Sequence, residues 1–237
     1  LSYVDYFTKE QVKINVTSVD VKPEGMSAFL AHLYSYETLK PREIAAELLD
    51  KKILVLDIGA GTTDILAIDK GKLVESSRTT IKLGGNDIIS RTRNKYNVRN
   101  KTNLSEPVFR DVLVKPEIGI GDTVVNIVKL VESSKREVSR QLINEITSFF
   151  EAQNIDLKTF NLLLVVGGGA LSNGESKALS ELIYKGVLDY IPEIRLLEEG
   201  LVKEPLLYEG ALDLTTLRTL NLLGALTARA LQTATTK

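Results

Sequence analysis

Cysteine is absent from the sequence, and His32 is its single histidine. Without cysteine there can be no disulfide scaffold and no zinc–thiolate site, and the absence agrees with a reducing cytoplasm, where we expect the protein. One histidine is too few for a histidine-based metal cluster, and it gives little support to a Ser-His catalytic triad.

The sequence also lacks a strong net charge and long apolar runs. The formal net charge is −1, so no overall basic field favours direct binding to nucleic acid or coating of a membrane. No apolar run is long enough for a membrane segment, and the N-terminus has no signal-peptide pattern. The chain begins with Leu1, and we expect that the start of the natural protein is missing.

What remains is an ordinary globular composition with mixed periodicity. The 237 residues are 43% hydrophobic and 26% charged, enough for two modest domains or one large one. Alternating and helical spacings interleave along the chain, which predicts an α/β fold. We expect strands at 12–21, 53–56, 65–68, 73–81 and 162–166, and helices at 26–36, 87–96, 123–150, 179–188 and 217–230.

The densest chemical signal is the string from Asp57 to Asp64. An apolar strand delivers Asp57 to its end, and two glycines and two threonines follow before Asp64 and a second apolar strand. Open backbone and hydroxyl groups let a polyanion approach closely, and a carboxylate at a strand end suits magnesium, which keeps much of its water. A tight hairpin would need a much shorter string, so we interpret this one as a magnesium–phosphate site.

The string resembles the second phosphate motif of the superfamily of actin, sugar kinases and heat-shock chaperone ATPases. The resemblance implies that Asp57 holds the water shell of Mg²⁺. It also implies that the turn embraces the terminal phosphates of ATP or ADP through Gly59, Gly61, Thr62 and Thr63. Asp64 is expected to brace the hairpin.

A second glycine-rich turn follows the apolar strand 162–166. Gly167, Gly168 and Gly169 alone would also suit a strand-to-helix turn. Their order and distance after the first motif resemble the adenosine motif of the same superfamily, in which the nucleoside lies against bare backbone. The resemblance therefore places Gly167, Gly168 and Gly169 beside the adenosine.

A polar stripe interrupts the long amphipathic helix. Glu132, Lys135, Arg136 and Ser139 share one face at spacings of three and four residues. The stripe can be a solvated face with an internal Glu–Lys pair. Its spacing is also similar to the helix that clamps adenine and ribose in the chaperone branch, which implies nucleotide contacts for Glu132, Lys135 and Arg136.

Glu24 lies in the turn Pro23-Glu24-Gly25, before an apolar helix. In ParM-type bacterial actins, a glutamate after proline at this point orients the attacking water, so the resemblance implies a catalytic role for Glu24 together with Asp57. Stabilisation of a helix N-terminus by a carboxylate is the alternative.

The resemblance implies an actin-like (ribonuclease H-like) nucleotide-binding fold, mostly the second of two domains. We expect residues 1–50 to be the remainder of the first domain, with its connecting helix at about 23–36. Residues 51–216 would form the second domain with a small subdomain at about 95–125, and 217–237 a second connecting helix and tail. The superfamily's first phosphate loop has no counterpart in residues 1–21, which puts catalysis by this chain alone in doubt.

Among the branches of this superfamily, ParM-type plasmid-segregation actins are the most similar. The short stretch 97–120 and the Pro23-Glu24-Gly25 turn both favour that branch. The resemblance implies an ATPase that forms filaments with copies of itself, and a DNA-binding adaptor as a further partner. A cell-shape or division scaffold of the actin type and a small-molecule kinase are the alternatives.

Overall fold

The computed structural model describes residues 2–4, 11–13, 23–35, 38–170, 178–197 and 224–232. At the N-terminal end, β1 (Ser2–Val4) pairs antiparallel with β2 (Gln11–Lys13). Most of the strand predicted over 12–21 lies outside the described residues.

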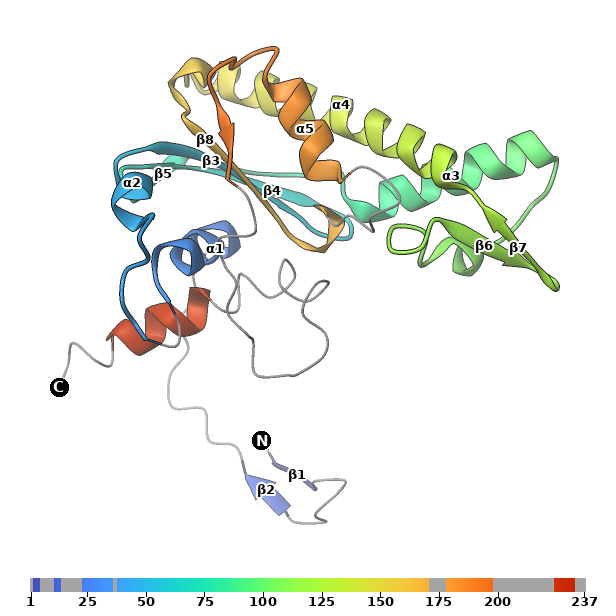
Figure 1. Cartoon of the computed structure of the whole chain (residues 1–237), viewed down its shortest axis with the longest axis horizontal. Coiled ribbons are helices and arrows are strands. Elements are labelled where there is room, and N and C mark those ends of the chain that lie inside the picture. The colour runs from blue at the N-terminus through green and yellow to red at the C-terminus, as the bar shows by residue number, and fades with distance from the viewer. Residues whose placement is uncertain are drawn as a thin grey trace.

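A five-stranded mixed sheet forms the centre of the molecule (Figure 1). Its strands are β3 (Lys52–Ile58), β4 (Thr63–Asp69), β5 (Lys72–Ile81), β8 (Leu162–Val166) and β9 (Arg195–Leu196). Their order is β5-β4-β3-β8-β9, with β3, β4 and β5 as an antiparallel meander and β8 parallel to β3. The meander and the bounds of β8 agree with the sequence prediction.

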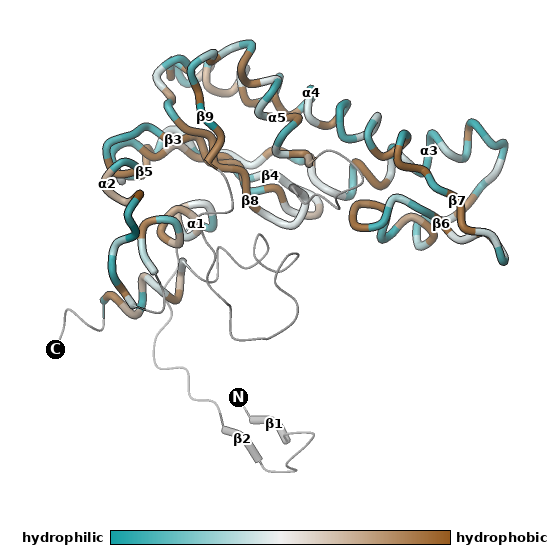
Figure 2. Tube along the Cα trace, viewed as in Figure 1, coloured by the Kyte–Doolittle hydropathy of each residue, from teal (hydrophilic) through white to brown (hydrophobic). Residues whose placement is uncertain are grey.

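Helices cover both faces of this sheet (Figure 1). One face packs against α1 (Glu24–Leu33) and α2 (Ala45–Leu49) through a cluster that includes Phe29, Leu48 and Val55. The other face packs against the start of α3 (Gly85–Asn100), α4 (Val128–Ala152) and α5 (Leu179–Val187). Figure 2 shows the resulting concentration of hydrophobic residues along the strands.

A small unit between α3 and α4 has a hydrophobic cluster of its own. It contains η1 (Glu106–Phe109) and the antiparallel pair β6 (Glu117–Ile120) and β7 (Thr123–Asn126). Phe109 lies fully buried between the helices and packs edge-on against Tyr96 of α3. Two further short 3-10 turns, η2 (Leu157–Thr159) and η3 (Gly168–Ala170), flank β8.

The predicted start of the long helix is wrong. Residues 123–126 form β7, and α4 begins at Val128. Thr123, Val124 and Val125 are β-branched and follow Gly121, whose φ of 57° turns the chain back onto β6. β-Branched residues favour strands, and Val124 is 64% exposed, so its helical spacing from the apolar residues of α4 does not reflect burial.

Three other helices differ from their predicted bounds by two residues or more. α1 starts two residues early, at Glu24, because Pro23 fits just before a first helical turn, and it ends at Leu33, where Tyr34 is extended. α3 continues beyond Tyr96 to Asn100 and ends where Lys101 adopts a left-handed conformation. Of the helix predicted over 217–230, residues 217–223 lie outside the described part, and residues 224–232 are helical.

Candidate functional site

Two turns meet at one edge of the central sheet. β3 and β8 run parallel, with Asp57 beside Val166, so the turn after β8 and the turn between β3 and β4 leave the sheet together. The first turn is closed by a hydrogen bond from the Gly59 amide to the Thr62 carbonyl, 2.8 Å long. Open α/β sheets place ligands at the carboxyl ends of their strands, so this edge is the candidate site.

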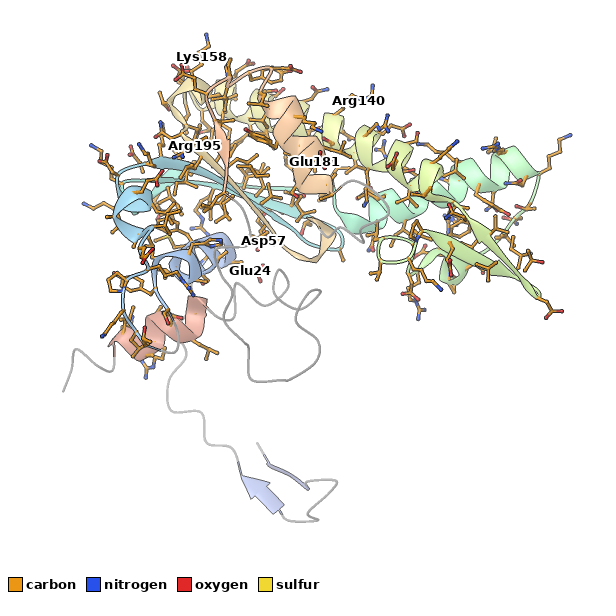
Figure 3. All side chains as sticks on the ribbon, viewed as in Figure 1. Glu24, Asp57, Arg140, Lys158, Glu181 and Arg195 are labelled. Atoms are coloured by element: carbon orange, nitrogen blue, oxygen red, sulfur yellow. The ribbon has the colours of Figure 1, made fainter. Side chains whose placement is uncertain are left out.

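Three carboxylates lie on the same face of the sheet near this edge. Asp57 shares the face of Ile53 and Val55, which pack towards α1, and Asp64 lies opposite it on β4. Glu24 opens α1 on that face, and Figure 3 draws Glu24 and Asp57 close together in projection. Asp57 is only 6% exposed, as expected of a carboxylate at the end of an apolar strand.

Gly25 brings the first turn of α1 down onto the sheet. A Cβ atom here would lie 2.9 Å from Leu66 and 3.0 Å from Val55, so no larger residue fits without displacement. The close approach places Glu24 and Asp64 on the wall of a cavity of about 390 Å³, which Thr80 also lines. The Thr80 hydroxyl donates a 2.5 Å hydrogen bond to Asp64, which agrees with a bracing role for Asp64.

The glycines of the two turns differ in what surrounds them. Gly167 has a φ of 92°, and a Cβ there would collide with the Asp57 carboxylate; a Cβ on Gly169 would lie 2.7 Å from the Gly59 carbonyl. Tight packing of one turn on the other therefore explains these two glycines. Gly61 has no atom within 4 Å of a Cβ position, so steric packing does not explain why it is glycine.

The start of α3 holds the turn between β3 and β4 by hydrogen bonds, a feature that the sequence prediction missed. The amides of Gly85 and Asn86 donate to the carbonyls of Gly59 and Ala60, at 3.0 and 2.7 Å. Thr63, predicted to contact phosphate, is fully buried, and its hydroxyl donates to the Leu83 carbonyl at 2.7 Å. In this structure the Thr63 side chain therefore fixes the turn instead of pointing outward.

The polar stripe of α4 is divided between interior and surface. Lys135 is fully buried and Ser139 nearly so, whereas Glu132 and Arg136 form a 3.2 Å ion pair. The interpretation as one solvated face is therefore wrong, because Lys135 and Ser139 lie inside. Burial lowers the pKa of Lys135 to about 8, and the negative charge of Glu132 offsets only part of this effect.

Glu132 and Arg136 line a recess of about 520 Å³ together with Lys129, Ser133 and Arg140. This recess lies on α4, which packs on the face of the sheet opposite α1 and Glu24. The structure thus brings Asp57, Glu24 and the two glycine turns to one edge of the sheet. It places Glu132, Lys135 and Arg136 on a separate element.

A magnesium ion would find oxygen ligands at this edge, but few of them. Within the described ranges, no group of three acidic, histidine or cysteine side chains could hold a metal ion. His32 is buried, and its Nδ1 atom forms a 2.9 Å hydrogen bond with the Ala28 carbonyl. The Asp57 carboxylate fits an ion that keeps most of its water shell and meets the protein through one side chain.

The family models identify the class of protein. The family described as archaeal actin homologue MreB-like, C-terminal, matches residues 55–176, which span β3 through the second glycine turn, and the chain belongs to this family. The mixed sheet with helices on both faces is accordingly an actin-like fold, in agreement with the sequence prediction.

Individual relatives agree with this assignment. The chain is 28% identical over 202 residues to the cell shape-determining protein Mbl of Bacillus subtilis (strain 168), covering 73% of this chain and 60% of Mbl. Two solved structures share the fold. Ta0583, an archaeal actin homolog in complex with ADP, has a TM-score of 0.66 at 18% identity, over 93% of this chain and 60% of that one.

The second solved structure is a 15-stranded ParM filament from Clostridium botulinum. Its TM-score is 0.55 at 16% identity, over 80% of this chain and 51% of the ParM chain. The chain thus spans at most 60% of the length of these three proteins. Within its described part, no helix is both long and apolar enough to cross a bilayer.

Proposed function

We propose that this chain binds ATP and ADP with Mg²⁺ at the edge where β3 and β8 end. The proposal rests on one observation: the buried carboxylate of Asp57 lies next to a turn with free space at Gly61. A Cβ on Gly61 would meet no atom within 4 Å. An open glycine turn beside a carboxylate suits a hydrated magnesium ion and phosphate oxygens. Membership of an actin homologue family supports the same reading.

Each predicted residue has a role in this proposal. Asp57 holds the magnesium water shell, and the backbone of Gly59, Gly61 and Thr62 contacts the terminal phosphates, while Thr63 holds the turn. Gly168, the half-exposed glycine of its triplet, lies nearest the nucleoside, with Gly167 and Gly169 packing the turn. Glu132 and Arg136 contact adenine and ribose from the recess on α4, the buried Lys135 adds its positive charge from the interior, and Glu24 orients the attacking water.

The larger function that we propose for the whole protein is a filament whose subunits add with bound ATP and leave after hydrolysis. Plasmid DNA segregation in the cytoplasm, through a DNA-binding adaptor, is the first candidate for its use. A cell-shape scaffold is the second, and the similarity to Mbl is the observation that favours it.

An isosteric change at Asp57 tests the site. Asp57→Asn keeps the volume of the side chain and removes the charge that holds the magnesium water shell, so magnesium-dependent phosphate release should fall at least about a hundredfold. Asp69→Asn is the matched control, because Asp69 is exposed at the far end of β4. Wild-type phosphate release by the Asp57 variant would contradict the assignment.

Glu24→Gln separates catalysis from binding in the same assay. Loss of a water-orienting carboxylate should slow phosphate release about a hundredfold while ATP affinity, measured by titration calorimetry, stays within about twofold. If ATP affinity falls instead, Glu24 supports the structure of the site and does not act on water.

Sedimentation of the protein with ATP and Mg²⁺ tests the filament. Polymers that form with ATP and Mg²⁺ and disappear as phosphate is released support the proposed cycle. Stable polymers without turnover would favour a static scaffold, and the absence of polymers in both nucleotide states would overturn the filament proposal.

A further inference from the structure

Helix α3 connects the two separate parts of the proposed nucleotide site. The first residues of α3 hydrogen-bond to the turn after β3. In its middle, Arg91 and Lys95 form ion pairs with Glu137 of α4, the residue next to Arg136. Figure 1 shows α3 and α4 beside one another at the end of the molecule that carries the small unit. One rigid element therefore spans from the proposed phosphate turn to the proposed nucleoside helix.

The attachment at the first end is made by backbone. The Gly85 and Asn86 amides donate to the Gly59 and Ala60 carbonyls, and a Cβ on Gly84 would lie 2.7 Å from both of these oxygens. Asp87 closes the helix start by accepting a 2.9 Å hydrogen bond from the Gly84 amide. Because backbone contacts have little freedom, the turn and the helix start should move as one body.

The attachment to α4 is made by charged side chains. Lys95 donates to the Ser133 hydroxyl at 2.9 Å and forms a 2.8 Å ion pair with Glu137. Arg91 lies 3.6 Å from Glu137 and donates a 2.5 Å hydrogen bond to Gln141. Ser133, Glu137 and Gln141 follow one another at intervals of four residues, so the two cations contact one face of α4 over two turns.

Ser133 joins this network to the recess. It accepts the hydrogen bond from Lys95 and also lines the recess with Glu132 and Arg136. A change in the rotation of α4 about its axis would move Glu132 and Arg136 with respect to the turn after β3. Lys95 and Glu137 are 26% and 36% exposed, and they join α3 to α4 as part of a network rather than as one surface pair.

We propose that Lys95 and Glu137 are positioning residues for the nucleotide, holding the nucleoside face of α4 in register with the phosphate turn through α3. This inference rests on the proposed nucleotide function and adds a residue pair that touches no part of the ligand. Inorganic tripolyphosphate would contact only the phosphate turn, so its binding should not depend on the position of α4. ATP would contact both the turn and α4, so its binding should depend on that position.

The test compares the affinities of these two ligands, both with Mg²⁺, for the wild-type chain and its variants by titration calorimetry. Lys95→Met should weaken ATP binding about tenfold and leave tripolyphosphate binding within about twofold, and Glu137→Gln should do the same. Lys95→Arg should keep wild-type ATP affinity, because a guanidinium can still bridge Ser133 and Glu137. Arg93→Met is the matched control, since Arg93 pairs with Glu106 of the small unit at 3.4 Å.

Each result decides between the claims. Equal losses of ATP and tripolyphosphate affinity would mean a general structural role and would overturn the positioning role. Unchanged ATP affinity in Lys95→Met and Glu137→Gln would also overturn it, while the proposed nucleotide function would stand. If the wild-type chain binds neither ligand, both the proposed function and this inference fail.

Discussion

Two glycines that no packing requires allow a test at the scale of single residues. A methyl group at Gly61 would meet no atom within 4 Å, and the same is true of Gly119 in β6. Gly61→Ala should therefore keep the wild-type free energy of unfolding within about 0.5 kcal/mol, and ATP affinity should fall about tenfold because the methyl group crowds the phosphate. Denaturant unfolding and calorimetry measure the two quantities.

Gly119→Ala is the control for this change. It adds the same methyl group to open space, far from the proposed site, and should leave both stability and ATP affinity unaltered. Equal ATP affinity for Gly61→Ala and Gly119→Ala would remove Gly61 from the phosphate site.

The lowered pKa of Lys135 predicts that nucleotide binding takes up a proton at alkaline pH. Burial lowers its pKa to about 8, so at about pH 8.5 most of the side chain is neutral in the free chain. A bound polyanion favours the charged form and raises the pKa, so binding should take up a proton at this pH and very little at about pH 6.5, where the side chain is already charged. Calorimetry in two buffers of different ionisation enthalpy measures the uptake.

The variant Lys135→Met should bind ATP without proton uptake at the alkaline pH. Uptake that persists in the variant would come from another group and would contradict the proposed electrostatic role of Lys135 in nucleotide binding.

Sequence alone proposed the candidate site residues but could not predict their environment. The string from Asp57 to Asp64 was recognisable because carboxylates, glycines and hydroxyls are consecutive there. Nothing local distinguishes Thr63, which is buried, from Thr62, which is exposed, since strand direction and the approach of Leu83 decide it. The burial of Lys135 depends on residues distant in the chain, so helical spacing could not predict it.

At the scale of elements, the bulge between β4 and β5 depends on one hydroxyl. The register of the two strands shifts between Ile65 and Ala67, and Ser77 is fully buried at this point. Its hydroxyl accepts from the Ala67 amide at 2.7 Å and donates to the Val74 carbonyl at 2.5 Å. Ser77→Ala would leave a buried amide without this acceptor and should lower the free energy of unfolding by about 1–3 kcal/mol.

The exposed neighbour Ser76 provides the control, because Ser76→Ala removes the same atom from solvent-accessible surface. Urea unfolding of both variants gives the comparison. Equal midpoints for the two would show that the bulge does not need the hydroxyl.

Elements with one consistent periodicity were predicted well. β8 is apolar at all five positions and is followed by Gly167, and its predicted bounds were correct. The start of α4 was not, because Val124 and Ile127 fit a helical stripe by spacing while the turn at Gly121 pairs the same segment with β6. Pairing with a partner strand is a tertiary effect that the spacing of apolar residues does not contain.

At the scale of the whole molecule, the hydrophobic clusters divide the chain into the sheet with its two helix layers and the small unit. The clusters on the two faces of the sheet share its strands, whereas the third consists of residues from α3, η1, β6 and α4 around Phe109. α3 and α4 contribute to both parts, which makes them the mechanical connection between the sheet and the small unit.

This division predicts local unfolding of the small unit. Phe109 is fully buried and packs edge-on against Tyr96, 5.7 Å between ring centroids, so Phe109→Ala should cost about 3–5 kcal/mol of stability in its cluster. Hydrogen exchange should then accelerate in η1, β6 and β7, while amides of β3 and β8 keep wild-type protection because their cluster does not include Phe109.

Phe150→Ala is the matched change in the sheet cluster, since Phe150 is equally buried and packs edge-on against Phe160. It should accelerate exchange in β3 and β8, the strands whose residues share its cluster. Hydrogen exchange in the small unit should rise only to the extent that α4, which Phe150 helps to hold on the sheet, becomes less stable. If Phe109→Ala instead raises exchange in β3 and β8 as much as in β6, the small unit and the sheet unfold as one cooperative body. α3 then transmits stability as well as position between them.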